Sequence, residues 1–195
     1  MNMQAMLAFL IYILINAFTP GPGNILALNT MTNNGWEKGK NLFFGIFTGY
    51  YFVQALCAFF TFGLDKLIHP VMFVLKYVGA VYIAWLAIHI ALSKPDNKSE
   101  DNKPSFWSGF FLQFVNVKIF LFGITALTGY VVPYYTSLVM LLFFEMFIAT
   151  IGIIATLTWI FFGGIFQKTY LKHFRVVNVI LALILLQSAF GLVFR

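Results

Sequence analysis

Charged side chains are scarce in this chain of 195 residues, where Asp, Glu, Lys and Arg together make up only 9% and hydrophobic residues make up 61%. A typical soluble domain is about one quarter charged and about half apolar. A globule of this length leaves too much of its surface in water to hide such an excess of apolar side chains. The composition excludes an ordinary soluble domain, and we expect one domain, residues 1–195, whose solvent is a lipid bilayer.

The sequence patterns of several function classes are also missing. The single cysteine, Cys57, lies in an apolar run, which excludes a disulfide framework and a Cys-x-x-Cys pair. The three histidines have no metal-ligand spacing, and neither a phosphate-binding loop nor a hydrolase motif is present. The net charge of +6 is spread over short loops, unlike the basic face of a nucleic-acid-binding protein. We therefore expect no metal, no cofactor, no nucleic-acid partner and no enzymatic activity.

Six apolar runs remain, each of the length of about 20 residues that a transmembrane helix needs. They are Ala5–Met31, Asn41–Gly63, Val71–Leu92, Phe106–Val132, Ser137–Gly163 and Val176–Phe194. A long polar stretch, residues 93–105, follows the third run and divides the chain into halves 1–92 and 106–195. Because each half has an odd number of runs, the second half enters the membrane in the opposite sense, as in the inverted repeats of many transporters. The predicted fold is all-α, with six transmembrane helices in a 3+3 inverted repeat.

Basic residues predict how these helices are oriented, because lysine and arginine are enriched in loops that stay in the cytosol. Most of the 12 basic residues lie in the first, third and fifth loops, whereas the loops and termini on the other side hold only Lys66 and Arg195. Those on the first side are Lys38, Lys40, Lys94, Lys98, Lys103, Lys168, Lys172 and Arg175. We therefore expect residues 93–105 to be a cytosolic linker and both termini to lie outside the cell.

The first run is interrupted by the sequence TPGPGN, residues 19–24. Pro20 and Pro22 each lack a backbone donor and clash with the carbonyl one turn earlier, and the two glycines loosen the backbone. Unwound backbone inside a membrane is tolerated only where it is buried in protein or lines a water-filled cavity. We expect the first helix to be broken here, and two prolines followed by Asn24 favour a functional break over a simple kink.

The fourth run carries Gln113, Asn116 and Lys118, and we expect this helix to be broken as well. At 1.5 Å per residue, both polar segments lie about 15–18 Å from the cytosolic face, near the middle of a hydrocarbon core of about 30 Å. Lys118 is too deep for its ammonium group to reach the interface, and a charge at that depth costs a few kcal/mol. Two interpretations remain open: a structural ion pair, or a site for a substrate carboxylate that is assisted by free N–H groups at a helix start.

Glu145 lies inside the fifth run, too far from an interface for so short a side chain. It could bind a proton during transport or form an ion pair with Lys118, and the sequence favours neither. For a substrate, we expect Lys118 and Asn116 to hold the carboxylate, and the carbonyls freed by the prolines to bind the amine. The predicted substrate-binding residues are Pro20, Gly21, Pro22, Gly23, Asn24, Gln113, Asn116 and Lys118, and Glu145 is the candidate for proton coupling.

A G-x-x-x-G pattern in the second run is formed by Gly45 and Gly49. Small residues at this spacing let two helix backbones approach closely in lipid. We interpret the pattern as a helix-packing contact.

The residues of the two predicted breaks resemble those of the LysE/RhtB family of amino-acid exporters. The family carries a P-G-P signature in its first helix, which is similar to PGPGN at residues 20–24, and an N-P-K signature in its fourth, which is similar to NVK at residues 116–118. This chain departs from the family at Gly23, where a polar residue is usual, and at Val117, where proline is usual. The stretches TPGPGNILAL and FWSGFFLQFVNVK resemble the branch that exports cysteine and O-acetylserine, where valine is expected at this place.

The resemblance covers the whole chain. It implies a secondary transporter in the bacterial inner membrane that exports small amino acids, cysteine and O-acetylserine foremost, and is driven by an ion gradient instead of ATP. The export of a zwitterion would then be coupled to proton entry. Two other classes remain: a membrane-embedded enzyme, and an assembly factor that uses the broken helix only to dock a partner. Both alternatives predict no substrate flux through the purified protein.

Overall fold

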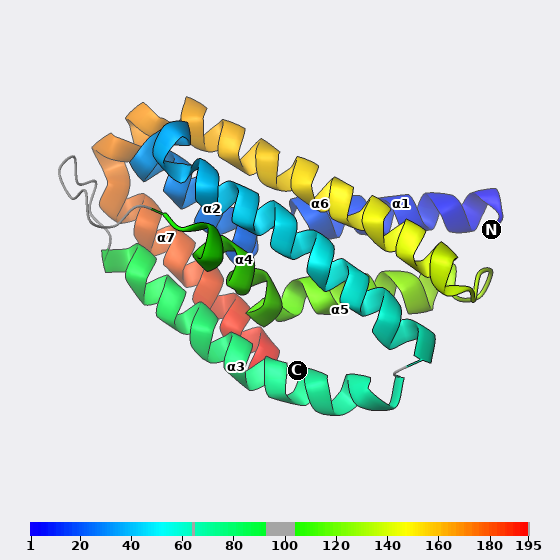
Figure 1. Cartoon of the computed structure of the whole chain (residues 1–195). Helices are drawn as coiled ribbons and strands as arrows, with labels where there is room; N and C mark the ends of the chain where they lie inside the picture. Colours follow the sequence, from blue (N-terminus) through cyan, green and yellow to red (C-terminus); the bar gives the residue numbers. More distant parts are fainter. Residues whose placement is uncertain (64, 93–103, 195) are drawn as a thin grey trace.

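The computed structural model describes residues 1–63, 65–92 and 104–194, and side chains within these ranges except those of residues 65–72, 75, 192 and 194. Every regular element in the described ranges is helical, which confirms the predicted all-α class (Figure 1). The elements are α1 (Met3–Phe18), α2 (Pro22–Gly63), α3 (Asp65–Leu92), α4 (Phe106–Val115), α5 (Val117–Ala126), the π-helical turn η1 (Leu127–Val131), α6 (Leu138–Ile165) and α7 (Gln167–Phe194).

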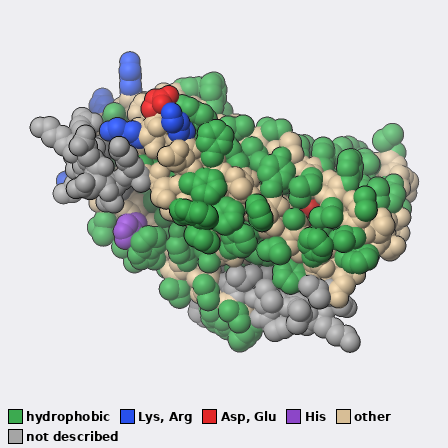
Figure 2. Space-filling view, viewed as in Figure 1, with side chains coloured by type: hydrophobic (Ala, Val, Ile, Leu, Met, Phe, Trp, Pro, Cys, Tyr) green, Lys and Arg blue, Asp and Glu red, His purple; other side chains and the backbone are tan. Residues whose placement is uncertain are grey.

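The helices form a bundle in which α2 packs along α4 and α6, and α3 packs along α7 (Figure 1). The core between them is apolar, with fully buried aromatic side chains such as Phe9 and Phe43. The outer surface is apolar as well (Figure 2), with large hydrophobic side chains such as Val81 and Phe161 exposed by 72% and 65%. A protein with apolar groups both inside and outside needs lipid around it, as the composition predicts.

Three described helices are long and apolar enough to cross a membrane: Pro22–Gly63, Leu138–Ile165 and the part Gln167–Gly191 of α7. A fourth candidate is the pair Phe106–Val115 and Val117–Val131, which is bent by 57°. The apolar helix α1 and the apolar part Lys76–Leu92 of α3 are shorter. The chain is therefore a multi-pass helical membrane protein, and the count of six spans stays a prediction.

The first apolar run, Ala5–Met31, is not one helix. Helix α1 ends at Phe18, Thr19 is extended with φ −65° and ψ 145°, and α2 begins at Pro22. Each residue before a proline is driven away from helical torsions, which explains why Thr19 and Gly21 interrupt the helix. Proline is also favoured at the first position of a helix, where its missing N–H has no intrahelical role, and Pro22 occupies that position in α2.

The loop predicted after residue 31 is reduced to a sharp bend, because helical torsions continue on both sides of it. Only Gly35 departs from helical torsions, with φ 72° and ψ 179°. A straight helix of 42 residues would be about 63 Å long, roughly twice the hydrocarbon core, and this one residue divides α2 into two helical parts, residues 22–34 and 36–63. Glycine reaches a positive φ without the steric cost that a Cβ imposes, so a single residue is sufficient for the bend.

Two more helices begin before their predicted starts. Helix α3 begins at Asp65 instead of Val71, and α7 begins at Gln167 instead of Val176, with a bend at His173 (φ −125°, ψ 26°). Hydropathy reports which residues prefer lipid, whereas a helix can continue into the polar interface, because it satisfies its own backbone groups there too. The apolar runs were therefore shorter than the helices that contain them.

The G-x-x-x-G pattern of α2 packs against α4, as predicted. A Cβ added to Gly49 would lie 2.7 Å from the carbonyl oxygen of Phe110, and one added to Gly45 would collide with the backbone at Phe106. Gly109 of α4 faces the backbone of α2 in the same way. This close contact of two backbones brings the polar end of α4 against the centre of α2.

Basic side chains gather at one end of the molecule (Figure 2), and the N-terminus lies at the other end (Figure 1). The described members of this group are Lys38, Lys40, Lys168, Lys172 and Arg175. Most of the predicted linker, residues 93–103, lies outside the described residues together with its lysines. The segregation agrees with the charge pattern of the sequence, and the direction in which the termini face stays a prediction.

Candidate functional site

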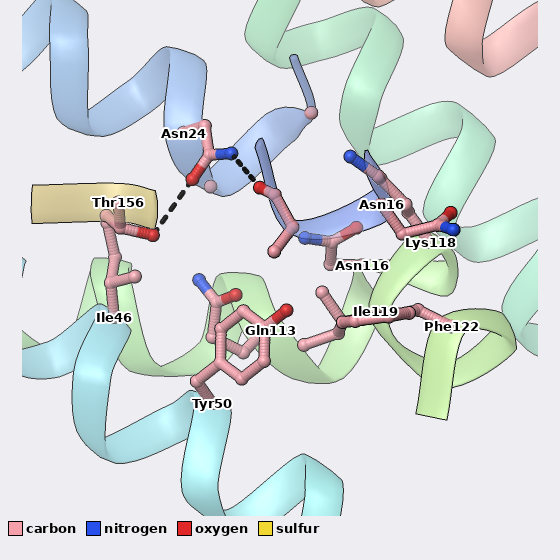
Figure 3. Close-up of a pocket in the computed structure, with 13 residues that line it drawn as sticks. Asn16, Asn24, Ile46, Tyr50, Gln113, Asn116, Lys118, Ile119, Phe122 and Thr156 are labelled. Carbon is pink, nitrogen blue, oxygen red and sulfur yellow. Dashed lines mark hydrogen bonds between the residues drawn. The ribbon is translucent and has the colours of Figure 1, made fainter. Parts of the chain in front are cut away.

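The two predicted breaks lie against each other (Figure 3). The Nζ of Lys118, in the first turn of α5, donates hydrogen bonds to the carbonyl oxygen and to the Oγ1 of Thr19, both at 2.9 Å. A Cβ added to Gly21 would lie 3.0 Å from the Lys118 side chain, and one added to Gly23 would lie 3.4 Å from the amide oxygen of Gln113. Segments about a hundred residues apart in the sequence therefore share one polar site, with glycine where the contact is tightest.

The ammonium group of Lys118 lies at the C-terminal end of α1, where the helix dipole places negative partial charge. Its ammonium group makes no ion pair: within the described part of the chain, the ion pair present joins Lys40 to Glu37 at 2.7 Å. The interpretation of Lys118 as a member of a structural ion pair, including a pair with Glu145, is therefore wrong for the described residues. A lysine has three N–H donors and Thr19 takes two of them, so one remains for an anion.

The carbonyls at the end of α1, which the break frees, all receive donors from side chains. Asn24 Nδ2 donates to the Ala17 carbonyl at 3.0 Å, and Trp159 Nε1 donates to the Phe18 carbonyl at 3.2 Å. The Oγ1 of Thr19 donates to the carbonyl of Asn16 at 2.9 Å. We expected these carbonyls to be free for a substrate amine, but the protein satisfies them itself, because unpaired carbonyls inside a membrane are costly.

Asn24 connects the break in the first half to a helix of the second half. Its Oδ1 accepts a hydrogen bond of 2.8 Å from the Oγ1 of Thr156 in α6, and the same hydroxyl also approaches the Gly152 carbonyl at 3.0 Å. Asn24 and Thr156 are both buried. The start of α2 is thus held to α6 by a polar contact as well as by apolar packing.

A small pocket opens where these groups meet (Figure 3). Its free volume is about 20 Å³, which is room for about one water molecule. On the α4–α5 side, Gln113 Nε2 donates to the Gly109 carbonyl at 3.1 Å, whereas the Oδ1 of Asn116 is buried and has no hydrogen-bond partner. A buried acceptor that stays unpaired costs about 1–3 kcal/mol, so this oxygen is a place at which a bound donor gains free energy.

Six of the predicted site residues line this pocket and two do not. Pro20 is exposed, and Pro22 is buried at the start of α2, so both prolines shape the backbone without reaching the pocket. The predicted residues on the lining are Gly21, Gly23, Asn24, Gln113, Asn116 and Lys118. Glu145 also lies elsewhere, buried between α6 and α2.

Sequence reasoning missed three polar residues of the lining: Asn16, Tyr50 and Thr156. Each is a polar or amphipathic residue inside an apolar run. Tyr50 follows directly after Gly49 of the packing contact, so the sequence offered a signal that Tyr50 lies close to the helix packed there. The sequence gives no rotation of α1 or α6 about its axis, and that rotation decides whether Asn16 and Thr156 face the pocket.

Helices interrupted within an apolar bundle, with polar groups gathered at the breaks, define a membrane transporter. The chain belongs to the LysE type translocator family, whose family model matches residues 14–195. This confirms the family to which the sequence pointed, and it decides against an enzyme or an assembly factor.

The curated relatives carry one description. A cysteine/O-acetylserine efflux protein of Klebsiella pneumoniae subsp. pneumoniae is 41% identical over 187 residues, which cover 95% of each chain. A cysteine/O-acetylserine efflux protein of Escherichia coli O157:H7 is 39% identical over 183 residues, which cover 93% of this chain and 94% of the relative. No solved structure matches the chain.

Proposed function

We propose that this protein exports small amino acids, cysteine and O-acetylserine foremost, across the bacterial cytoplasmic membrane as a proton-coupled secondary transporter. The relatives are cysteine/O-acetylserine efflux proteins, which supports these two substrates. The observation that carries the proposal is the position of Lys118: a cation without a carboxylate partner, held by Thr19 at the break between α1 and α2. A cationic group at this depth is costly, and an anionic group of a passing substrate would compensate it.

Six spans in two related halves are part of this proposal. The first half would consist of α1 with residues 22–34 as one broken span, residues 36–63, and α3. The second half would consist of α4 with α5 and η1 as the other broken span, then α6 and α7. The packing supports such a repeat, because the second spans of the two halves, α2 and α6, lie together, and so do the third spans, α3 and α7.

The substrate carboxylate would bind at Lys118 and at the start of α2. The first turn of a helix leaves N–H groups without intrahelical partners, and Gly23 and Asn24 of this turn line the pocket. The substrate amine would bind the unpaired Oδ1 of Asn116, which is an acceptor, and this differs from the carbonyl site that we expected from the sequence. A zwitterion would thus meet donors and an acceptor in one small pocket.

Transport requires this pocket to open, because about 20 Å³ cannot hold an amino acid. A carboxylate that binds Lys118 competes with Thr19 for the ammonium group, so substrate binding weakens the contact between the two breaks. We infer that this exchange of partners lets one half rock against the other.

The test is counterflow of radiolabelled cysteine and O-acetylserine in proteoliposomes of the purified protein. We expect label to accumulate transiently in vesicles preloaded with unlabelled substrate, and not in protein-free vesicles. Lys118→Met should lose this uptake at concentrations near the half-saturation of the wild type. The matched control is Lys76→Met, which removes a lysine of α3 that is not part of the pocket. Wild-type protein that shows no counterflow of either compound would exclude the proposed substrates.

A further inference from the structure

A second buried polar cluster lies on the seam between α2 and α6, outside the substrate pocket. It consists of Glu145 of α6 with Gln54 and Cys57 of α2, and all three side chains are completely buried. A Cβ added to Gly123 of α5 would lie 3.1 Å from Glu145 Oε1 and 3.1 Å from Cys57 Sγ, and closer still to Gln54 Oε1. These groups therefore converge on the space that Gly123 leaves open.

The side-chain oxygen and nitrogen atoms of this cluster are without partners. Both carboxylate oxygens of Glu145 and both amide atoms of Gln54 are buried and make no hydrogen bond. The thiol of Cys57 points to the Phe120 carbonyl at 3.8 Å. Two fully buried polar side chains that stay unsatisfied side by side are costly in an apolar bundle, so they need a reason to be there.

An ionised carboxylate cannot be the resting form of Glu145, because no cation in the described part of the chain forms an ion pair with it. Lys118 is bound to Thr19, and the ion pair in the described residues is the exposed one between Lys40 and Glu37. The titratable groups that face Glu145 from α2 are Tyr50 and Cys57. Helix α1 and the turn η1 carry Tyr12 and Tyr130, whose rings pack against each other. None of these four side chains can carry a positive charge, so the carboxyl group needs a proton to reside here.

A protonated carboxyl group fits its neighbour. The neutral acid has one O–H donor, and Gln54 Oε1 on the facing helix is an acceptor without a donor. A metal ion does not fit as well, because sodium-like hard cations require several oxygen ligands. The described residues contain no group of three or more His, Cys, Asp or Glu side chains that could supply them.

The cluster is separate from the substrate pocket and connected to it. Tyr50, one turn before Gln54 on α2, lines the pocket, and a Cβ on Gly152 of α6 would lie 2.7 Å from its Oη. Glu145 is two turns before Gly152, which is about 10 Å along α6 and toward the end away from the basic loops. One seam, α2 against α6, therefore carries both sites, and it joins the two halves of the proposed repeat.

We propose that Glu145 is the coupling-proton site of this transporter and that Gln54 is the hydrogen-bond acceptor of its protonated form. This inference rests on the proposed export function. In the outward-open state the Glu145 carboxylate takes a proton from outside, and its O–H then donates to Gln54 Oε1 as the seam closes. In the inward-open state the same proton leaves to the cytosol. One proton enters for each zwitterion that leaves, and no bond other than O–H is made or broken.

The test compares exchange with gradient-driven uptake of O-acetylserine in proteoliposomes. Glu145→Gln keeps the size of the side chain and fixes it in a neutral form. We expect it to catalyse counterflow at equal pH on both sides within about twofold of the wild type. With the lumen one pH unit more acidic and the membrane potential clamped at zero, one-proton antiport gives the wild type about tenfold accumulation at equilibrium. Glu145→Gln should give none.

The outcomes separate the two proposals. Wild-type protein without counterflow refutes the export function itself. Glu145→Gln that still accumulates O-acetylserine on a pH gradient refutes the coupling site, and so does a wild type whose accumulation follows a sodium gradient instead. A Glu145→Gln variant that loses exchange together with accumulation also refutes it, because Glu145 would then serve the structure or the substrate path. Gln54→Leu serves as the second variant, and we expect its pH-driven accumulation to fall while its counterflow is retained.

Discussion

Replacing Lys118 with methionine keeps an unbranched side chain that is one atom shorter and removes its charge. The change removes two hydrogen bonds of 2.9 Å to Thr19, and hydrogen bonds to charged groups contribute about 1.5–3 kcal/mol each. It also removes a charge whose placement near the bilayer centre costs about 2.5–3.5 kcal/mol. The Thr19 carbonyl keeps a second donor, Asn24 Nδ2 at 3.3 Å. Because these effects oppose each other, we expect the free energy of unfolding to fall by no more than about 2 kcal/mol.

Substrate binding has no such compensation. The carboxylate of the substrate would lose one charge-assisted hydrogen bond, which is about 1.5–3 kcal/mol, or about 10- to 150-fold in affinity. The assay measures the half-saturating concentration of O-acetylserine in counterflow and the thermal unfolding of the same detergent-purified sample. A shift of Tm of a few degrees, together with the loss of affinity, is the expected result. An unchanged half-saturating concentration would refute the role of Lys118 in binding, and a collapse of Tm would show that its role is structural.

Three further predictions concern packing, the contact between the halves, and orientation. Gly49→Ala places a Cβ 2.7 Å from the Phe110 carbonyl oxygen and should destabilise the protein by about 1–3 kcal/mol. The control is Gly63→Ala, whose Cβ would have nothing within 4 Å, and it should change Tm little. Equal Tm values of the two variants would contradict the α2–α4 contact. Thr156→Val removes the hydrogen bond to Asn24, so it should lower the unfolding free energy by about 1 kcal/mol and slow counterflow. The control Thr158→Val loses only a hydrogen bond to the Ile154 carbonyl and should leave counterflow unchanged. Peptide tags on both termini should be accessible to antibodies in intact spheroplasts, and a protected C-terminus would overturn the orientation inferred from the lysines.

The two helix breaks could be predicted from the sequence, because their causes are local. The prolines of residues 19–24 act on the torsions of their immediate neighbours, and this is what separates α1 from α2. Asn116 interrupts the second broken helix with φ −83° and ψ 82°, although the residue after it is valine and not proline. The contact between the two breaks was predicted from their similar depth in the membrane. This depth can be estimated for each helix by itself, from its distance in residues to the cytosolic end.

The parts that could not be predicted depend on contacts between helices. Thr156 and Asn16 face the pocket because of how α6 and α1 are rotated, and periodicity is uninformative in helices that are apolar on all sides. The pairing of Glu145 with Lys118 was a plausible alternative by depth, but Glu145 faces Gln54 on α2, a helix from the other half of the chain. The helical torsions close to Gly35 on both sides were not predicted, because hydropathy marks the edge of the membrane and not the end of a helix.

The single bent residue inside α2 has a mechanical consequence. Residues 22–34 carry Gly23 and Asn24, and residues 36–63 carry Tyr50 and Gln54. Only Gly35 separates these two helical parts of α2. A long flexible loop would absorb a displacement of residues 22–34, whereas a connection of one residue couples it to the orientation of residues 36–63. If a bound carboxylate tilts residues 22–34, residues 36–63 would move with them, and this movement would reach the place where Gln54 faces Glu145.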